Sequence, residues 1–522
     1  MPRGALRVDL PPPQKGVRSD LPKHLVPDGF LAAGENVICR DGRVYTRPGY
    51  LPLTTTAPTA NRVMGGIHYF DNTATQRVVV GTTASFHSFN GSTWSAITGA
   101  TVPAGGDADQ FQFAVYPRTS STRLIAVNDQ MVPQVWTGSG NFADLGGSPP
   151  IARSATVAFE RAVLGNLTIS GTRQSSDIAV SAFQDPASWP TTLGHRVSLT
   201  DTKDSIVAVK ALNAQVFAIY KDRSQWVGIG TANLFPFTFE LRDQQVGPVS
   251  PNVVVQAEND HYYVGQDGDV YQFDGNRARA IGGWAKRLIQ NDLDFNNMGQ
   301  SHGFYDRINR EIWWFWPSYR AAARTGGIAY RLPYEDVPGA FSPLMVYTDT
   351  LTASLDWRDT QTFGWNDLTG TWDNLSKDYP TWDSFPNLGS LGELVGQSSG
   401  QVHRFGRSGG DNGTTFDAYW DLPYRALAGV GDMAQIDVIE SFFKQTSSTV
   451  NAQIVLMTTD TLATDGTLAT AQEVDLSSNT QHRASYANTL ARFATVRHRI
   501  LAGQGLNEFR GSVLFFWRRG EQ

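Results

Sequence analysis

A serine between two glycines is the part of this chain that comes nearest to a catalytic motif. The run Gly396-Gln397-Ser398-Ser399-Gly400 matches G-x-S-x-G, in which the serine attacks a carbonyl group from a sharp turn between a strand and a helix. The residues that follow, 401–405, predict a strand and not a helix. We therefore interpret the motif as a hairpin turn, and we expect no catalytic residue in this chain.

Acidic residues beside tryptophans form a second candidate site. They occur in four short runs: Trp357-Arg358-Asp359, Trp365-Asn366-Asp367, Trp372-Asp373 and Trp382-Asp383. In a glycan-cleaving protein, a pair of carboxylates hydrolyses the glycosidic bond. The structural interpretation, which we favour, is that each Asp or Asn side chain hydrogen-bonds a turn while the ring packs on a neighbouring hairpin. A glycan-binding or glycan-cleaving protein, an adhesin or a depolymerase, remains the alternative function.

Other motifs of metal and cofactor sites are missing from the sequence. The run Asp267-Gly268-Asp269 is too short for a calcium loop and has no distal glutamate. The nine histidines form no H-x-x-x-H or H-E-x-x-H pair, and neither a Walker loop nor a G-x-G-x-x-G before a helix is present. The sequence therefore predicts no metal and no cofactor.

Composition limits the remaining classes of function. The 522 residues carry a formal net charge of -6 without a long basic run, which argues against tight sequence-specific DNA binding. Cys39 is the single cysteine, so no intrachain disulfide is possible. The first residues, MPRGALRVDLPPPQKG, lack an apolar signal core, and no run of about 18 apolar residues occurs. We expect a protein made in a reducing compartment that does not bind a membrane.

The elements that position these residues repeat along the chain. Tyr262-Tyr263-Val264-Gly265 leads through a turn to Val270-Tyr271-Gln272-Phe273, and an apolar run, a Gly or Asn and a later aromatic recur in residues 78–91, 124–138 and 394–405. The Gly or Asn positions of the first two copies, Gly81 and Asn128, are separated by about the length of one four-stranded propeller blade. We expect the apolar run to be buried between adjacent blades, and the glycine to allow a bend.

From this repeat we predict an all-β fold, with a β-propeller of about six or seven blades over residues 51–410. A generic meander or sandwich is the alternative. The high content of aromatic residues (11%), the 50 glycines and the 26 prolines also favour short strands joined by turns. Residues 411–522 contain longer strands and predict a C-terminal antiparallel β-sandwich. The apolar spacing of residues 284–293 predicts one short helix.

Residues 1–50 predict an N-terminal arm with a hairpin. Asp41-Gly42 is typical of a hairpin turn, Val44-Tyr45 of a strand and Pro48-Gly49 of a second turn. We expect a two-stranded arm that leads into the first blade. Such an arm would close the propeller ring or dock on a neighbouring subunit, and a local hairpin without a partner is the alternative.

This N-terminal segment also resembles a known family. Its residues 16–22 (GVRSDLP), 26–30 (VPDGF), 35–37 (ENV) and 40–50 (RDGRVYTRPGY) are similar to the N-terminus of short-tailed bacteriophage tail hub or nozzle proteins, the packaged-DNA stabilisation group. Residues 181–189, 305–310, 365–368 and 381–383 add to the resemblance, which covers most of residues 16–410. The motif and interface positions that it carries over are Asp28, Gly29, Asn36, Asp41, Gly42, Arg47, Pro48, Gly49 and Tyr50.

The resemblance implies a structural protein of the virion tail, assembled in the cytoplasm of the bacterial host. It would form a homo-oligomeric ring, with six copies expected, below the portal and adaptor, and it would contact tail fibres, spikes or a needle. Genomic DNA would be retained by the ring and would pass through its lumen at ejection, without sequence specificity. The task would be mechanical, and no residue would carry out covalent chemistry.

Overall fold

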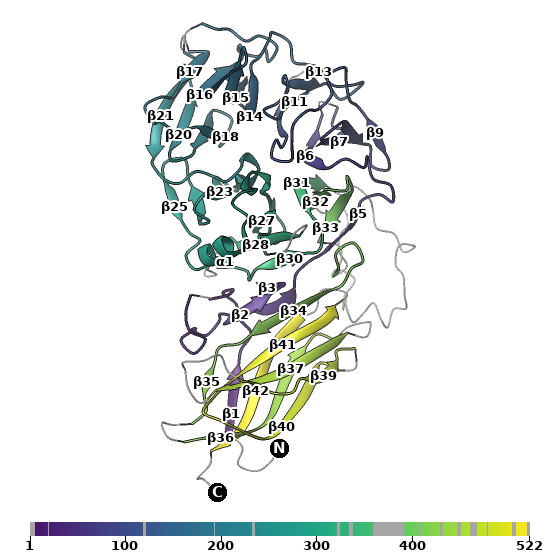
Figure 1. Cartoon of the computed structure of the whole chain (residues 1–522), viewed down its shortest axis with the longest axis vertical. Helices are drawn as coiled ribbons and strands as arrows, with labels where there is room; N and C mark the ends of the chain where they lie inside the picture. Colours follow the sequence, from purple (N-terminus) through teal and green to yellow (C-terminus); the bar gives the residue numbers. More distant parts are fainter. Residues whose placement is uncertain are drawn as a thin grey trace.

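The chain folds into a seven-bladed β-propeller joined to a pair of larger sheets (Figure 1). The computed structural model describes residues 6–18, 20–71, 73–117, 122–192, 194–231, 235–320, 324–333, 338–358, 391–406, 409–428, 432–445, 450–459, 467–477, 479–503 and 508–518. In these residues almost all regular structure is β, as expected, and the number of blades confirms the prediction of six or seven. None of the helices in the described ranges is long and apolar enough to span a bilayer.

Each blade is an antiparallel sheet with consecutive strands as neighbours, except the sixth, whose fifth strand pairs with its third, and the last. Blades 1 to 3 consist of β6 (Val63–Phe70), β7 (Gln76–Thr82), β8 (Phe86–Phe89) and β9 (Trp94–Ala96); β10 (Gln112–Tyr116), β11 (Arg123–Val127), β12 (Gln134–Trp136) and β13 (Ala143–Asp144); and β14 (Ile151–Ala158), β15 (Arg161–Ile169), β16 (Thr172–Val180) and β17 (Arg196–Ser198). Blades 4 to 6 consist of β18 (Ile206–Ala211), β19 (Val216–Lys221), β20 (Gln225–Gly230) and β21 (Phe237–Asp243); β22 (Val255–Ala257), β23 (Asp260–Val264), β24 (Val270–Phe273) and β25 (Ala278–Ala280); and β26 (His302–Asp306), β27 (Glu311–Pro317), β28 (Thr325–Arg331), β29 (Ala340–Phe341) and β30 (Met345–Tyr347).

The seventh blade closes the ring with a strand from the N-terminal part of the chain. Its strands are β31 (Leu351–Arg358), β32 (Leu391–Gln397), β33 (Val402–Phe405) and β5 (Tyr50–Pro52). Tyr50 pairs with Phe405, and Pro52 pairs with His403. The N-terminal segment therefore closes the ring, one of the two roles expected for it, and it enters the last blade before the first.

The sequence repeat corresponds to the second and third strands of blades 1, 2, 5 and 7. In β7, Val78 and Val80 pack with blade 7, while Val79 packs with blade 2, so the apolar run is buried on both faces as expected. The glycines of the repeat in blades 1 and 7 also avoid a collision with the next blade. A Cβ on Gly81 would lie 2.6 Å from the Phe111 ring, and one on Gly396 would lie 2.5 Å from Val63. These glycines are needed because the chain entering the next blade occupies the space of a side chain.

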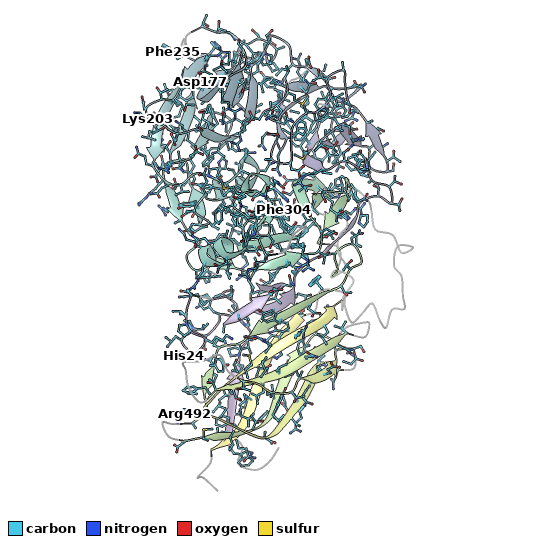
Figure 2. The ribbon with its side chains drawn as sticks, viewed as in Figure 1. His24, Asp177, Lys203, Phe235, Phe304 and Arg492 are labelled. Atoms are coloured by element: carbon cyan, nitrogen blue, oxygen red, sulfur yellow. The ribbon has the colours of Figure 1, made fainter. Side chains whose placement is uncertain are left out.

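The first strands of the blades surround the axis of the propeller. The first strands of neighbouring blades contact one another from β6 to β18, the 3-10 helix η1 (Pro251–Val253) bridges β18 to β26, and β26 contacts β31, which returns to β6. Figure 2 shows Phe304, on the first strand of blade 6, in the interior, and Lys203 at the outer edge.

Two antiparallel sheets form the C-terminal part, which extends from the side of blades 6 and 7 (Figure 1). One contains β3 (Val37–Arg40), β4 (Arg43–Thr46), β42 (Glu508–Arg518), β36 (Ala434–Phe443), β40 (Gln481–Ala491) and β1 (Leu6–Leu10). The other contains β2 (Ala33–Glu35), β34 (Phe416–Asp421), β35 (Arg425–Ala426), β41 (Phe493–Gly503), β37 (Asn451–Thr459), β38 (Thr467–Leu468) and β39 (Gln472–Asp475). Side chains of both sheets, such as Ile436 and Ile454, share one hydrophobic core.

The N-terminal segment differs from the separate arm expected for residues 1–50. Strands β1 and β4 both pair with β42, and β2 pairs with β34. The hairpin turn itself is as predicted, because Asp41 and Gly42 have φ values of 48° and 73°, as a two-residue type I′ turn requires. The hairpin is part of a C-terminal sheet because its apolar residues Val37, Cys39 and Val44 complete the core of that part.

The helix predicted for residues 284–293 is present as α1 (Ala285–Asp292). It is held to blade 5 by Lys286, whose Nζ lies 2.6 Å from an Asp267 oxygen and 3.4 Å from an Asp269 oxygen. The carboxylates of the Asp267-Gly268-Asp269 run therefore bind a lysine. A second 3-10 helix, η2 (Met298–Gln300), precedes blade 6.

Candidate functional site

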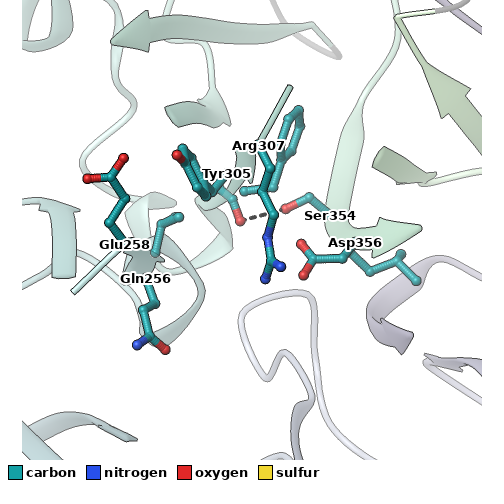
Figure 3. A pocket seen from close by; sticks show the side chains of 10 residues that line it. Gln256, Glu258, Tyr305, Arg307, Ser354 and Asp356 are labelled. Carbon is teal, nitrogen blue, oxygen red and sulfur yellow. Dashed lines mark hydrogen bonds between the residues drawn. The ribbon is translucent and has the colours of Figure 1, made fainter. Parts of the chain in front are cut away.

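A cavity of about 610 Å³ opens at the centre of the propeller, between blades 5, 6 and 7. Exposed polar side chains stand at its mouth, namely Gln256, Glu258, Arg307 and Asp356. Figure 3 shows Arg307 and Asp356 close together, and Gln256 and Glu258 on the other side of the cavity. Tyr305 and Phe304 add aromatic surface. The cavity is therefore polar, open to solvent and lined by charges of both signs.

Two carboxylates are neighbours beside this cavity. Asp356 on β31 lies directly opposite Glu393 on β32, and adjacent residues in this register project to the same face. Burial raises the pKa of Glu393 well above its usual value, and the charges of Asp356 and Asp306 raise it further. Both effects disfavour the charged form of Glu393. Among the residues that the structure describes, no group of three or more His, Cys, Asp or Glu side chains could hold a metal ion.

A second, smaller cavity of about 150 Å³ lies beside the first, and Gly303 and Ser354 line both. Lys210, at the end of β18, and the amide side chains Gln112 and Asn252 also line this inner cavity. Lys210 Nζ donates a hydrogen bond of 2.8 Å to Gln112 Oε1. Burial lowers the pKa of Lys210 to about 8.

A chain of amides continues from Lys210 across the axis of the propeller. Gln112 Nε2 donates to Asn252 Oδ1, and Asn252 Nδ2 donates to Gln110 Oε1 at 2.7 Å. Gln110 Nε2 then donates to the carbonyl oxygens of Gln300 and Thr352, at 2.9 and 3.0 Å. Blades 2, 4 and 7 and the chain around blades 5 and 6 are thus linked at the centre. These residues were not identified from the sequence, because single polar residues at the ends of apolar strands form no motif.

The serine motif lies at the hairpin between β32 and β33, as predicted. Ser398 is exposed, and Ser399 Oγ donates a hydrogen bond of 2.8 Å to Gln397 Oε1 within the turn. Gly400 has φ +84°, and a Cβ there would lie 2.0 Å from the Thr59 carbonyl oxygen. The second glycine of the motif is therefore explained by the turn and by its contact with the chain before blade 1.

Of the four tryptophan runs, only Trp357 and the backbone of Arg358 lie within the described residues. Trp357 is buried, and its ring centroid lies 5.8 Å from that of Phe89 and 6.2 Å from that of His68, both in blade 1. It packs between blades 7 and 1, as the structural interpretation expects. The other members of these runs, residues 359–383, lie outside the described residues.

Four of the residues from the family resemblance meet where the propeller joins the C-terminal sheets: Asn36, Arg47, Gly49 and Tyr50. Arg47 is fully buried and forms two hydrogen bonds of 2.7 Å to the carboxylate of Asp411. Asn36 Oδ1 accepts hydrogen bonds from Arg47 Nε at 2.9 Å and from the Val346 amide at 2.8 Å. Asn36 thereby links β30 of blade 6 to the junction.

Further contacts of Pro48, Gly49 and Tyr50 hold this junction together. Tyr50 accepts a hydrogen bond of 2.9 Å from the Asn412 amide, and its hydroxyl donates to Asp349 at 2.6 Å. The Pro48 carbonyl accepts a hydrogen bond of 3.3 Å from Arg47 Nη1. A Cβ on Gly49 would lie 2.0 Å from the Gly410 carbonyl oxygen, so this position accepts only glycine without movement of the backbone.

The remaining positions from the resemblance lie apart from this junction. Asp28 pairs with Arg425, and Gly29, at φ +87°, accepts hydrogen bonds from the amides of Gln14 and Lys15 at 2.8 and 2.7 Å. Asp41 and Gly42 form the turn of the β3–β4 hairpin. The nine positions therefore hold the N-terminal segment in place, and they line neither cavity at the propeller centre.

The chain is similar to several solved structures at low sequence identity. It is similar to the WD40 domain of Neurospora crassa Pan2, with 12% identity over 70% of this chain and 96% of that one, at a TM-score of 0.36. It is also similar to YCF48 bound to D1 peptide, with 8% identity over 72% and 97% of the two chains at 0.37, and to BamB from Moraxella catarrhalis, with 12% over 77% and 98% at 0.33. No family description and no curated protein matches the chain.

Proposed function

We propose that the chain is a structural protein of a short-tailed bacteriophage tail, and that copies of it form the hub or nozzle ring below the portal and adaptor. The observation that carries the proposal is the role of the resembling segment. Asn36, Arg47, Gly49 and Tyr50, taken from the residues with the strongest resemblance, form the buried joint between the two parts of the molecule. A stiff joint between two β bodies suits a wall that must keep its shape.

The path of DNA in this proposal runs between subunits. The first strands of the blades contact one another around the axis, and amide side chains cross it. A nucleic acid duplex has no passage there. The ring of copies would therefore enclose the lumen with its outer surfaces. The net charge of -6 fits a wall that does not trap phosphate groups, and we expect the loops that face the lumen to carry an excess of Asp and Glu.

The proposal is tested by the mass of the native assembly. Purified protein, alone and mixed with the adaptor ring of its phage, is measured by native mass spectrometry and imaged by electron microscopy. We expect rings, with six copies as the expected number, that bind the adaptor and to which fibres, spikes or a needle attach. A trimer that binds host cells on its own would contradict the proposal and support an adhesin. A ring with a strongly positive lumen would contradict the acidic wall.

The outer cavity of the propeller favours one alternative, a glycan-binding or glycan-cleaving tail protein. It offers about 610 Å³ with Tyr305, Glu258, Arg307 and Asp356 at its walls, which suits a polar ligand of the size of a sugar unit. Incubation with host polysaccharide tests it. New reducing ends, or binding that is lost in a Tyr305→Ala variant, would support the alternative, and the absence of both would count against it.

A further inference from the structure

Lys210 brings a positive charge into the centre of the propeller without a carboxylate beside it. Its ammonium lines the inner cavity and donates one hydrogen bond, to the neutral Gln112 side chain. It forms no ion pair with any of the residues that the structure describes, and no nearby acid contributes to the shift of its pKa. Lys210 is half-buried, with its ammonium at the wall of the cavity. The remaining N–H groups of Lys210 are therefore available to a partner in the cavity, and a negatively charged partner would supply the missing counter-charge.

The amide chain reinforces this positive charge. A lysine ammonium only donates, so Gln112 must present Oε1 to it and turn its NH₂ group toward Asn252. Asn252 must then present Oδ1 to Gln112 and donate from Nδ2 to Gln110. Every amide oxygen in the chain faces the lysine end. The orientation stabilises a charged Lys210, because hydrogen bonds in such a chain polarise one another.

The other ionisable groups near Lys210 do not neutralise its charge. His261 on β23 donates a hydrogen bond from Nε2 to the Ala211 carbonyl oxygen and accepts one at Nδ1 from the Tyr220 hydroxyl. Burial lowers its pKa to about 4, so it is neutral at pH 7. Glu258 and Asp356 line the outer cavity and not the inner one. Within the described residues, the walls of the inner cavity are glycine, amide, hydroxyl and apolar groups besides Lys210.

We propose that the inner cavity binds a small free oxyanion, a carboxylate or phosphate group, through Lys210 Nζ and the Asn252 amide. The volume of about 150 Å³ equals that of about five water molecules at roughly 30 Å³ each. It accepts an ion such as acetate or phosphate with a few waters, and it is too small for a sugar chain. The ion reaches it through the outer cavity, because Gly303 and Ser354 line both spaces.

Such an anion would stabilise the ring of blades. Lys210 belongs to blade 4, Gln112 to blade 2, and Asn252 lies just before blade 5. An ion held by this group bridges blades that are far apart in the sequence, and binding to the folded state alone raises the stability by mass action. The site is independent of the tail function proposed above, since it is formed within one chain and does not require a ring of copies.

Binding is tested by calorimetry on the full chain at pH 7, with sodium acetate and sodium phosphate titrated at constant ionic strength set with sodium chloride. We expect one site for wild type, a rise in Tm with ligand, and at least about a tenfold loss of affinity in Lys210→Met, since a charge-assisted bond is removed. Lys203→Met is the matched control, because Lys203 is exposed at the outer edge of the propeller (Figure 2). It should bind like wild type.

Three results would overturn the proposal: no binding by wild type at tens of millimolar ligand, equal affinity in Lys210→Met, or equal loss in Lys203→Met. If Lys210→Met does not fold, wild-type crystals soaked in selenate decide the question. Anomalous density within hydrogen-bond distance of Lys210 Nζ supports the site, and water alone in the cavity rejects it. The acetate and phosphate arms show which oxyanion class the cavity prefers.

Discussion

Arg47 and Asp411 form a buried bidentate ion pair between segments 364 residues apart in the sequence. Both side chains are fully buried, with Nη1–Oδ1 and Nη2–Oδ2 distances of 2.7 Å. The guanidinium also lies between two rings, 4.0 Å from the centroid of Tyr347 and 3.7 Å from that of Phe416. Tyr347 belongs to blade 6 and Phe416 to a C-terminal sheet, so one cation joins both parts of the molecule.

The first prediction follows from this pair. Replacing Arg47 with Met leaves the Asp411 carboxylate buried without its cation, and removing one partner of a buried pair costs about 3–5 kcal/mol. We expect a loss of that size in the free energy of unfolding, measured by urea titration with tryptophan fluorescence. The double variant Arg47→Met with Asp411→Leu should lose less than the single variant, because no unpaired charge remains. A double variant as unstable as the sum of both single variants would contradict this account.

An exposed pair provides the control for the first prediction. Arg7 and Asp9 form an ion pair with side chains that are 56% and 63% exposed, and such pairs contribute little. Arg7→Met should leave the urea midpoint unchanged within error.

The second prediction concerns the closing strand. In Gly49→Ala the new Cβ would lie 2.0 Å from the Gly410 carbonyl oxygen, so backbone must move. We expect a loss of about 1–3 kcal/mol, as for other overpacked sites, and faster proteolysis near β5, measured by mass spectrometry of the fragments. Gly299→Ala is the matched control, because its Cβ would meet only Ala108 Cβ, at an ordinary 3.7 Å. Equal cleavage rates in both variants would contradict the close approach at Gly49.

The blades could be predicted from the sequence because the signal is local. Strands two and three of a blade are adjacent in the chain. Their apolar run must cover both faces of the sheet, so runs like Val78, Val79 and Val80 recur in later blades. The reason for the glycine could not be predicted in this way. Gly81 faces Phe111 of the next blade, and Gly396 faces Val63 of the first. Such contacts join residues of different blades, so the sequence of one repeat does not indicate them.

The strand pairing of the N-terminal segment and the inner cavity could not be predicted either, because both depend on residues that are far apart in the chain. The apolar residues Val8 and Val44 indicate that these strands belong to a sheet, but not that they pair with β42 at the far end of the sequence. Lys210 lies near the end of β18, after four buried residues, and many surface lysines occupy such a position. Only the ring closure brings it to Gln112 and Asn252.

The third prediction is a loss of stability in acid. Burial lowers the pKa of three histidines, His261, His302 and His403, from 6.5 to about 4, and that of His498 to about 3. As pH falls below 6.5 the unfolded chain takes up protons that the folded chain rejects, so unfolding becomes easier. The free energy of unfolding should fall between about pH 6.5 and pH 4, by up to about 1.4 kcal/mol per pH unit for each histidine. Urea titrations at fixed pH values measure this slope.

A single variant isolates one of these histidines. His403 is fully buried, neither ring nitrogen has a hydrogen-bond partner among the residues that the structure describes, and its ring lies edge-on to Tyr50 at 5.0 Å. His403→Leu should keep most of its stability at pH 8 and should reduce the slope below pH 6.5 by about one proton. Val402→Ala, at the neighbouring buried position, should lower stability at every pH and leave the slope as it is. An unchanged slope in His403→Leu would mean that His403 becomes protonated in the folded protein.

The fourth prediction is that anion binding at Lys210 fades at moderately alkaline pH. The lowered pKa of about 8 means that the ammonium is charged at pH 7 and loses its proton at a pH where an ordinary lysine, near 10.4, keeps it. Acetate is the suitable probe, because its own charge stays constant from pH 6 to 10. Its affinity should be constant up to about pH 7.5 and should fall as pH rises past 8. The facing groups Gln112 and Asn252 do not titrate, and His261, with a pKa of about 4, is neutral throughout. An affinity that persists to pH 10 would assign the ion to surface lysines instead, because only they would still be charged.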